Sequence, residues 1–192
     1  MNKKILFLAL AILVTIPTMM FAADDRANVF AAALSSGYVF KHDCNFKQVY
    51  GHGLINVLTA DVCYYPFRIA GFGAKASYWR SHGGKTSFLR FCSQLHEVPV
   101  TVYARLIKGF DCGLQIYGSL GGGVALIREK SYLGCAKAHK GIGEIEFGVF
   151  HPIWWALNVT AAVRYVFPRQ CQCDEKIDVG GADLRAGVGI VF

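Results

Sequence analysis

The sequence has few charged residues, few prolines and, after its first residues, no long apolar run. Charged residues make up 17% of the 192 residues and proline occurs five times, whereas hydrophobic residues make up 54%. A transmembrane helix needs about 20 consecutive apolar residues, and only the run 5–16 approaches that pattern. No 3.6-residue periodicity is sustained after Ala23, which argues against a bundle of amphipathic helices. The abundant apolar surface must therefore be organised in another way.

The first residues have the pattern of a secretory signal peptide. Two lysines precede the apolar run 5–16, and the small pair Ala22-Ala23 precedes two aspartates. A positive start, an apolar middle and small residues at the end are typical of a signal that is removed after export. We therefore expect a signal-peptide helix over 1–23 and a single β-barrel domain over 24–192. A retained helical anchor is the alternative for the first segment.

After the signal, apolar residues alternate with small or polar ones in segments of about ten residues, the length of a tilted membrane strand. Three tight connections, 65–68, 107–110 and 151–154, alternate with four long ones, 41–51, 80–95, 128–140 and 168–180. Short turns at one end and long loops at the other are typical of outer-membrane barrels. We therefore predict an all-β protein, an eight-stranded antiparallel up-and-down transmembrane β-barrel. Its strands are 28–40, 52–64, 69–79, 96–107, 112–127, 141–150, 156–167 and 181–192.

One face of these segments carries no charge, and the opposite face carries all the strand charges. That second face is also rich in glycine and serine, which suit the narrow interior of an eight-stranded barrel. Buried charges are tolerated when they are paired, so we expect them to form an ion network in the lumen. A soluble barrel with the apolar face inside is the alternative. The predicted network is Asp61, Lys75, Glu97, Arg105, Glu144, Glu146, Arg164, Asp183 and Arg185.

Aromatic residues gather at both ends of the segments, as expected for residues at two membrane interfaces. The group at the tight turns is Tyr64, Tyr65, Phe67, Phe110, Phe150, Trp154, Trp155 and Phe192. The group at the long loops is Tyr38, Phe40, Tyr78, Trp79, Tyr165 and Phe167.

Seven cysteines in an exported chain indicate an oxidising compartment. An odd number leaves at least one thiol free or paired with another molecule. Two hypotheses remain open, stapling of the loops within the monomer and cross-linking to other envelope proteins. The cysteines expected in long loops are Cys44, Cys92, Cys135, Cys171 and Cys173.

No sequence pattern indicates catalysis, a metal or a cofactor. The histidines form no H-x-x-H or H-x-x-x-H pair that would suggest a metal site. The glycine run 121–123 lies inside a segment with no following helix, unlike a phosphate-binding loop. Ser81, His82 and His96 are the residues from which a hydrolase constellation could be built. We predict that the chain is not an enzyme and needs no cofactor.

The last ten residues, 183–192, end in Phe192 and carry apolar residues at every second position before it. This pattern resembles the terminal signal that the outer-membrane insertion machinery reads. Together with the eight segments, it makes the chain over 28–192 similar to the small OmpA/OmpX-type outer-membrane β-barrel family, in a cysteine-rich variant. The resemblance implies the bacterial outer membrane as location. It implies outer-membrane lipid and the insertion machinery as partners.

The long loops carry eleven basic residues against five acidic ones, which suits anionic lipid headgroups such as the phosphates of lipopolysaccharide. We expect a structural, envelope-stabilising or adhesive surface role through these loops, with disulfide-linked envelope proteins as further partners. Nucleic acid is not expected as a partner of an exported chain. The alternatives are a lipid-modifying outer-membrane enzyme, a narrow porin-like channel and a soluble lipocalin-like binder.

Overall fold

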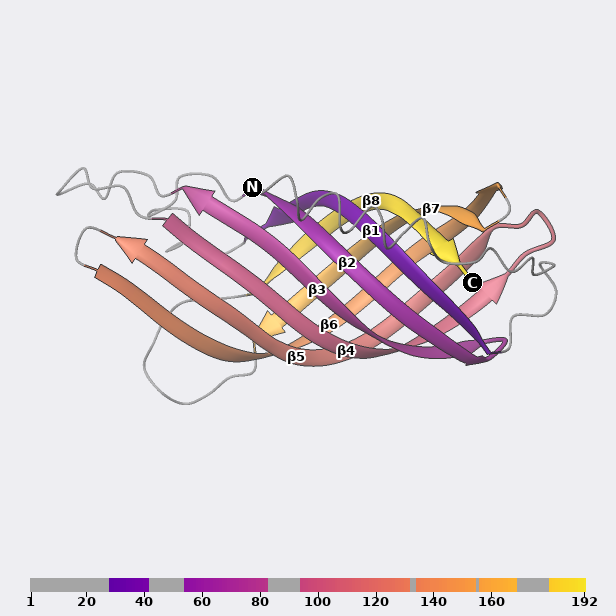
Figure 1. The fold of residues 1–192 in the computed structure, drawn as a ribbon, viewed down its shortest axis with the longest axis horizontal. Coiled ribbons are helices and arrows are strands. Elements are labelled where there is room, and N and C mark those ends of the chain that lie inside the picture. Colours follow the sequence, from indigo (N-terminus) through magenta and orange to yellow (C-terminus); the bar gives the residue numbers. More distant parts are fainter. Residues whose placement is uncertain (1–27, 42–53, 83–93, 132–133, 155, 169–179) are drawn as a thin grey trace.

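The computed structural model describes residues 28–41, 54–82, 94–131, 134–154, 156–168 and 180–192. Each strand pairs antiparallel with its neighbour in sequence, and the last pairs with the first, so the sheet closes into a barrel (Figure 1). The predicted fold class is therefore confirmed, while the expected signal peptide over 1–23 lies outside the described residues. The strands are β1 (Val29–Phe40), β2 (Leu54–Phe67), β3 (Ala70–His82), β4 (Gln94–Gly109), β5 (Gln115–Ser131), β6 (Gly134–Trp154), β7 (Leu157–Pro168) and β8 (Gly181–Val191).

Closure depends on the seam between β1 and β8, which pair from Ala31↔Val191 to Phe40↔Ala182. At the end of the seam, the backbone N–H groups of Phe30 and Phe192 each donate to the other residue's carbonyl at 2.8 Å. Their rings stack at 6.1 Å. Lipid offers no partner for a free backbone group, so a sheet can span it only when closed in this way. Among the described residues, no helix is long and apolar enough to cross a membrane.

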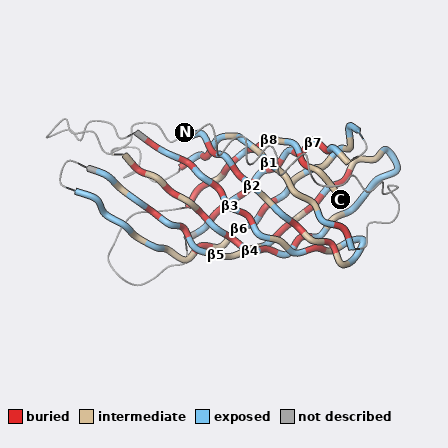
Figure 2. The backbone as a smooth tube through the Cα atoms, in the orientation of Figure 1, coloured by how far each residue is buried: buried red, intermediate tan, exposed pale blue. Residues whose placement is uncertain are grey.

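Exposed residues alternate with buried ones along much of each strand (Figure 2). The exposed side carries large apolar side chains, such as Phe72, Val102 and Leu120, which are 57%, 66% and 61% exposed. The buried side carries charged ones, such as Lys75 and Arg164, each 2% exposed. The charged face therefore lines the interior, which is the reverse of a soluble barrel.

The interior has three layers along the barrel axis. An apolar cluster fills the end from which the long connections leave, and it includes Val57, Trp79 and Ile127. A smaller cluster of Cys63, Tyr65 and Tyr103 lies toward the tight turns. Most of the buried charged side chains lie between the two clusters, whereas Lys41 and Glu97 lie at the apolar cluster beside Trp79.

Three aromatic residues that we placed at the membrane interfaces point into the lumen instead. Trp79 is 2% exposed because it follows the outward Tyr78 on an alternating strand. Tyr65 is buried because β2 continues to Phe67, so that Tyr65 still occupies an inward strand position. Phe150 is inward for the same reason, since β6 continues to Trp154, and its ring stacks on Tyr117 at 4.5 Å. Trp155 lies outside the described residues.

The tight turns lie later in the sequence than predicted. The strands β2, β4 and β6 end at Phe67, Gly109 and Trp154, later than the sequence pattern indicated. Two of these ends contain a proline at a shift in register, Pro66 between β2 and β3 and Pro152 between β6 and β7. Because an irregularity of this kind tolerates the missing N–H of proline, the strand continues through it.

The predicted long loop 128–140 is wrong. Its described residues, 128–131 and 134–140, belong to β5 and β6, which pair without interruption as far as Ser131↔Gly134. These two strands extend farthest at the left-hand end of the barrel in Figure 1. Cys135 is therefore a strand residue of β6 rather than a loop cysteine. The extension has no apolar alternation because it lies beyond the lipid-facing band, and for that reason its sequence has the composition of a loop.

Candidate functional site

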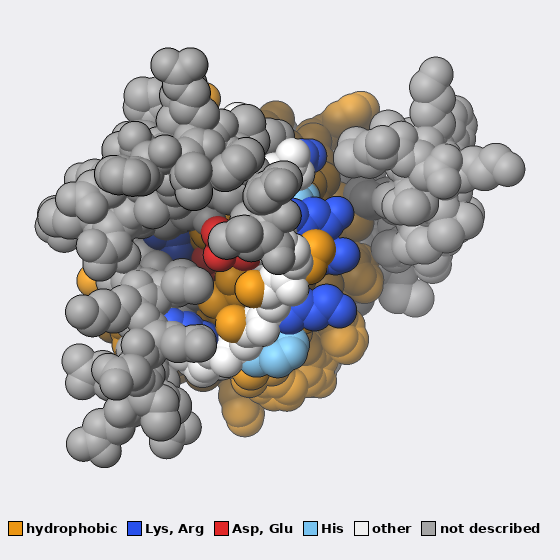
Figure 3. Space-filling model, turned by 90° about the vertical axis from the view of Figure 1, so that its left-hand side faces the viewer, with side chains coloured by type: hydrophobic (Ala, Val, Ile, Leu, Met, Phe, Trp, Pro, Cys, Tyr) orange, Lys and Arg blue, Asp and Glu red, His pale blue; other side chains and the backbone are white. Residues whose placement is uncertain are grey.

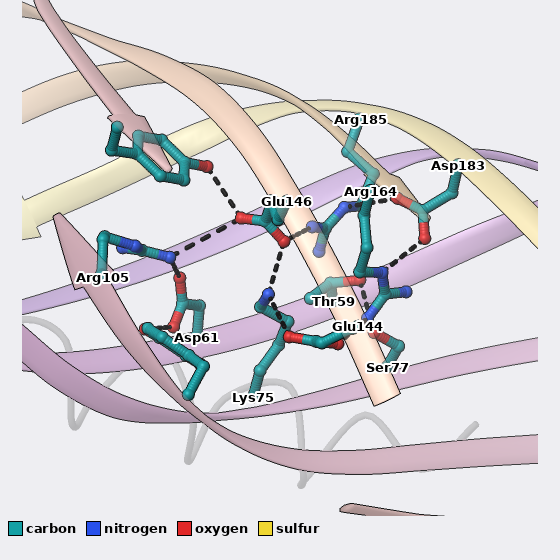
Figure 4. Close-up of polar contacts among 12 residues, drawn as sticks. Thr59, Asp61, Lys75, Ser77, Arg105, Glu144, Glu146, Arg164, Asp183 and Arg185 are labelled. Carbon is teal, nitrogen blue, oxygen red and sulfur yellow. Dashed lines mark hydrogen bonds and ion pairs between the residues drawn. The ribbon is translucent and has the colours of Figure 1, made fainter. Parts of the chain in front are cut away.

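Glu146 of β6 lies at the centre of the charged layer, where three cations from three other strands converge on it (Figure 4). Lys75 of β3 and Arg185 of β8 both donate to Glu146 Oε2. Arg105 of β4 places Nη2 3.6 Å from Glu146 Oε1. Each of these four side chains is at most 3% exposed. Such a carboxylate is tolerated away from water because several cations share its charge.

Glu144, two residues earlier on β6, extends the network toward the long-loop end. Lys75 Nζ donates to its Oε1 at 2.9 Å, and Arg164 Nη1 lies 3.4 Å from its Oε2. Arg164 Nε also donates to Asp183 Oδ2 at 2.6 Å. Arg185 Nε lies 2.9 Å from the other oxygen of Asp183, which closes a ring of alternating charges.

Arg105 carries the network toward the tight turns. Its Nη2 donates to Asp61 Oδ2 at 2.7 Å. Its guanidinium carbon lies 4.7 Å from the ring centre of Tyr103 and 4.3 Å from that of Tyr117, so the cation is held between two aromatic faces. Both phenols also donate hydrogen bonds to carboxylates, Tyr103 to Asp61 and Tyr117 to Glu146 Oε1 at 2.9 Å.

Eight of the nine charged residues that we assigned to the lumen are thus in one connected group. The ninth, Glu97, lies apart from it and pairs with Lys41 at 3.5 Å. Lys41 belongs to the predicted loop 41–51, but it is 3% exposed, and its ammonium lies 4.6 Å from the centre of a Trp79 ring. Sequence reasoning also missed Tyr103 and Tyr117, although each has the same strand parity as a predicted inward residue, Arg105 and Ser119 respectively.

Comparison with known proteins points to one kind of fold. No family model and no curated protein sequence matches the chain. Among solved structures, the outer membrane protein OprG from Pseudomonas aeruginosa matches with a TM-score of 0.63 and 13% identity, over 90% of this chain and 99% of that chain. Neisserial surface protein A matches with a TM-score of 0.59 and 13% identity, over 85% of this chain and 97% of that chain. The chain has the fold of the small outer-membrane β-barrels.

A third structure with this outer-membrane barrel fold is Ail, the attachment invasion locus protein of Yersinia pestis, in complex with the heparin analogue sucrose octasulfate. It matches with a TM-score of 0.54 and 15% identity, over 86% of this chain and 99% of that chain. The likeness to the OmpA/OmpX-type family that the sequence suggested is therefore confirmed at the level of the fold.

The apolar outer wall has the height that an outer-membrane barrel requires. On β5, the outward apolar positions run from Ile116 to Leu126. Ten residue steps at about 3.3 Å, tilted by about 45°, span about 23 Å along the barrel axis. The apolar band of such barrels is about 25 Å tall. The exposed Phe67 and Trp154 at one end and Tyr38 and Tyr165 at the other supply aromatic side chains at its borders.

The residues considered for a hydrolase constellation are not brought together by the barrel. Ser81 is buried on the inner side of β3, opposite Leu95 in register. His96 lies on the outer side of β4, where its Nδ1 is 3.0 Å from Tyr78 Oη. The barrel wall therefore separates the hydroxyl from the imidazole. His82 ends β3, and its side chain lies outside what the structure describes. Within the described ranges, no cluster of His, Cys, Asp and Glu could hold a metal ion.

The three described cysteines lie in three different environments, and none of them forms a disulfide. Cys63 is buried in the lumen, Cys112 is exposed in the turn between β4 and β5, and Cys135 is exposed on β6. The other four predicted loop cysteines, Cys44, Cys92, Cys171 and Cys173, lie outside the described residues.

Proposed function

We propose that this protein is a structural and surface-interaction barrel of the bacterial outer membrane, with its long loops facing the exterior. The observation that carries the proposal is the cross-barrel ion network inside a wall that is apolar outside. Lys75 of β3 and Glu144 of β6 belong to strands that do not pair, so their contact braces the barrel from the inside. A lumen filled by such braces supports a stabilising role rather than transport.

The long connections support a surface role. The strands on either side of residues 42–53, 83–93 and 169–179 end opposite the tight turns, which is the exterior end in barrels of this fold. Ail, which shares the fold, was crystallised with a sulfated heparin analogue. Basic loops on the present chain would suit an anionic partner of the same general kind, and adhesion is the form of surface interaction that we propose.

Two further partners belong to the proposal. The insertion machinery would read β8 and Phe192, whose ring stacks on Phe30 at the closing seam. Other envelope proteins would pair with thiols left over from the odd cysteine count. We propose no catalytic activity, no cofactor and no nucleic-acid partner.

Fractionation, heat-modifiability and conductance together test the proposal. The full-length gene is expressed in a Gram-negative host, and the protein is recovered from the outer-membrane fraction in detergent. We expect unboiled and boiled samples to migrate differently on a gel, because a closed barrel resists the detergent until it is heated. We also expect no steady conductance in planar bilayers. Recovery as a water-soluble monomer would overturn the membrane assignment, and discrete conductance steps would establish the narrow channel instead.

A further inference from the structure

A row of basic side chains crosses four neighbouring strands on the outer wall at the long-loop end. Arg80 of β3 pairs in register with His96 of β4, His96 with Arg128 of β5, and Arg128 with Lys137 of β6. Arg80, Arg128 and Lys137 are exposed, and His96 is half-buried. Seen from this end, Lys and Arg side chains gather on one side of the barrel next to histidine (Figure 3). We call Arg80, His96, Arg128 and Lys137 the basic row.

Within the described part of the chain, the outer face around Arg128 and Lys137 carries further basic side chains and no carboxylate. Lys130 on β5 lies one outward position farther from the membrane than Arg128. His139 on β6 pairs with Leu126 and lies one outward position nearer the membrane than Lys137, and both Lys130 and His139 are exposed. Among the described outward positions of β3 to β6 at this level there is no acidic side chain, since Glu129 has the parity of the inner face. Within the described part of the chain, no carboxylate forms an ion pair with Arg128, Lys130 or Lys137.

This arrangement is unfavourable for the protein alone. Residues directly opposite on paired strands have Cβ atoms about 5 Å apart, and like charges there repel. Arg128 and Lys137 are such a pair, and His96 lies on the other side of Arg128. A row of like charges on a sheet is stable when an external anion lies across it.

The row lies where lipid headgroups lie. On β4 and β5, the outward residues one step toward the membrane are Val98 and Leu126, which are paired and belong to the apolar band. At the same level β3 carries Tyr78 and β6 carries His139. Arg128 follows Leu126 by two residues, which is about 5 Å along the barrel axis for a tilted strand. The headgroup layer on each side of a bilayer is about 5–7 Å thick. The change from apolar to cationic therefore coincides with the boundary between acyl chains and headgroups.

We infer that the basic row is a docking site for the phosphates of a lipopolysaccharide molecule in the outer leaflet. Acyl chains of the lipid lie against Val98 and Leu126, while its phosphates lie across Arg128 and Lys137. Arg80 is held in place beside them by a hydrogen bond from its Nη2 to Gln94 Oε1 at 2.8 Å. A lipid fits better than a soluble polyanion because the row faces sideways and continues the lipid-facing wall. The inference rests on the proposed location in the outer membrane.

Two charge-matched variants test it. R128Q/K137Q removes the two adjacent cations on β5 and β6, and R68Q/K108Q removes two exposed positive charges at the tight-turn end. The full-length barrels are refolded in zwitterionic detergent micelles, and folding of each is checked by heat-modifiability. Native mass spectrometry then counts bound bisphosphorylated lipid A per barrel during a titration. Dephosphorylated lipid A, inorganic phosphate and soluble heparin are run as separate arms.

We expect R128Q/K137Q to need at least about tenfold more lipid A for half-saturation than the wild type, because each cation near a lipid surface contributes about 1 kcal/mol. R68Q/K108Q should reach half-saturation at the same lipid A concentration as the wild type. The wild type should bind dephosphorylated lipid A as weakly as R128Q/K137Q binds lipid A. Equal binding by both variants would overturn the inference. Stronger binding of heparin, or displacement of lipid A by equimolar inorganic phosphate, would also overturn it in favour of a soluble anion.

The same samples separate this inference from the proposed function. A folded wild-type barrel that shows no preference for the phosphorylated lipid would end the inference and leave the outer-membrane barrel intact. A wild-type chain that forms no heat-modifiable barrel would end both.

Discussion

Lys75 on β3 and Glu144 on β6 form an ion pair of 2.9 Å across the barrel interior, although their strands do not pair. Lys75 also donates to Glu146, so one ammonium is shared by two carboxylates. The backbone ladder of a barrel connects each strand only to its neighbours. Contacts across the lumen add a second set of connections, and these oppose flattening of the narrow cylinder.

Replacement of Lys75 by Met should destabilise the barrel strongly. The change leaves Glu144 and Glu146 short of one cation in a water-poor lumen, and breaking a buried pair costs about 3–5 kcal/mol. The free energy of unfolding is measured by urea titration in detergent micelles. Lys108→Met at the exposed end of β4 is the control, and it should change stability by less than about 0.5 kcal/mol. A loss no larger than that of the control would show that Lys75 is hydrated and not a brace.

The glycine run of β5 should respond to alanine according to the face on which each residue lies. A Cβ on the inward Gly121 would meet Val102 O at 2.7 Å and Tyr103 Cβ at 2.8 Å. A Cβ on the inward Gly123 would meet Thr101 Cα at 2.7 Å, whereas on the outward Gly122 its nearest neighbour is Ile142 O at 3.5 Å. Overpacking of this kind costs about 1–3 kcal/mol.

We therefore expect G121A and G123A to lower the free energy of unfolding by that amount, while G122A leaves it unchanged within about 0.5 kcal/mol. The three variants are matched in chemistry and adjacent in sequence, so urea titrations under one condition compare them directly. Equal effects of all three would mean that glycine is needed here for its backbone and not for the space inside the lumen.

Much of the barrel could be predicted because a strand that separates lipid from a polar lumen must alternate at every residue. Val102 and Leu120 on one side, and Lys75 and Arg164 on the other, follow this period of two, and it is visible in the sequence alone. The predicted strand number, order and inside-out sense were therefore right. Glu144 and Glu146 could be placed on one inner face from the sequence. The cations that pair with them come from other strands, and the stagger of those strands around the barrel cannot be predicted from the sequence of any one strand.

The parts that sequence could not predict lie where the lipid constraint ends. Residues 128–140 lack apolar alternation because they lie beyond the hydrocarbon layer of the membrane, so paired strands here have the composition of a loop. Trp79 and Tyr65 are aromatic residues near strand ends, and composition cannot distinguish an interface position from a lumen position one residue away. The basic row combines Arg80 with Lys137, and only the register of four strands brings them to one level.

An arginine on the outer wall should lower the free energy of unfolding more at mid-height than at the tight-turn end. Val102 is 66% exposed and lies midway between Val98 and Leu106 on the outer side of β4. In lipid, an arginine at mid-membrane on such a wall costs about 2–4 kcal/mol, falling to about 0–1 kcal/mol near the interface. We therefore expect V102R to lower the free energy of unfolding by about 2–4 kcal/mol and I69R by about 0–1 kcal/mol. Ile69 is the matched site because it is equally exposed, in the turn after β2.

Unfolding of V102R and I69R is measured in phospholipid vesicles. If both variants were as stable as the wild type, the outer wall would face water, and the membrane assignment would fail at its central point.

The three described cysteines report which end of the barrel faces out. Cys135 lies on the projecting part of β6, Cys112 lies in a turn at the opposite end, and Cys63 is 1% exposed in the lumen. Variants that keep only one of the three and none of the other four cysteines are expressed in a Gram-negative host and treated with a membrane-impermeant maleimide. Because the long-loop end faces the exterior in our proposal, Cys135 should react in intact cells. Cys112 should react only after the outer membrane is permeabilised, and Cys63 only after the barrel is unfolded by heat. Labelling of Cys112 but not Cys135 in intact cells would invert the barrel, and the basic row would then face the inner leaflet, where lipopolysaccharide is not its partner.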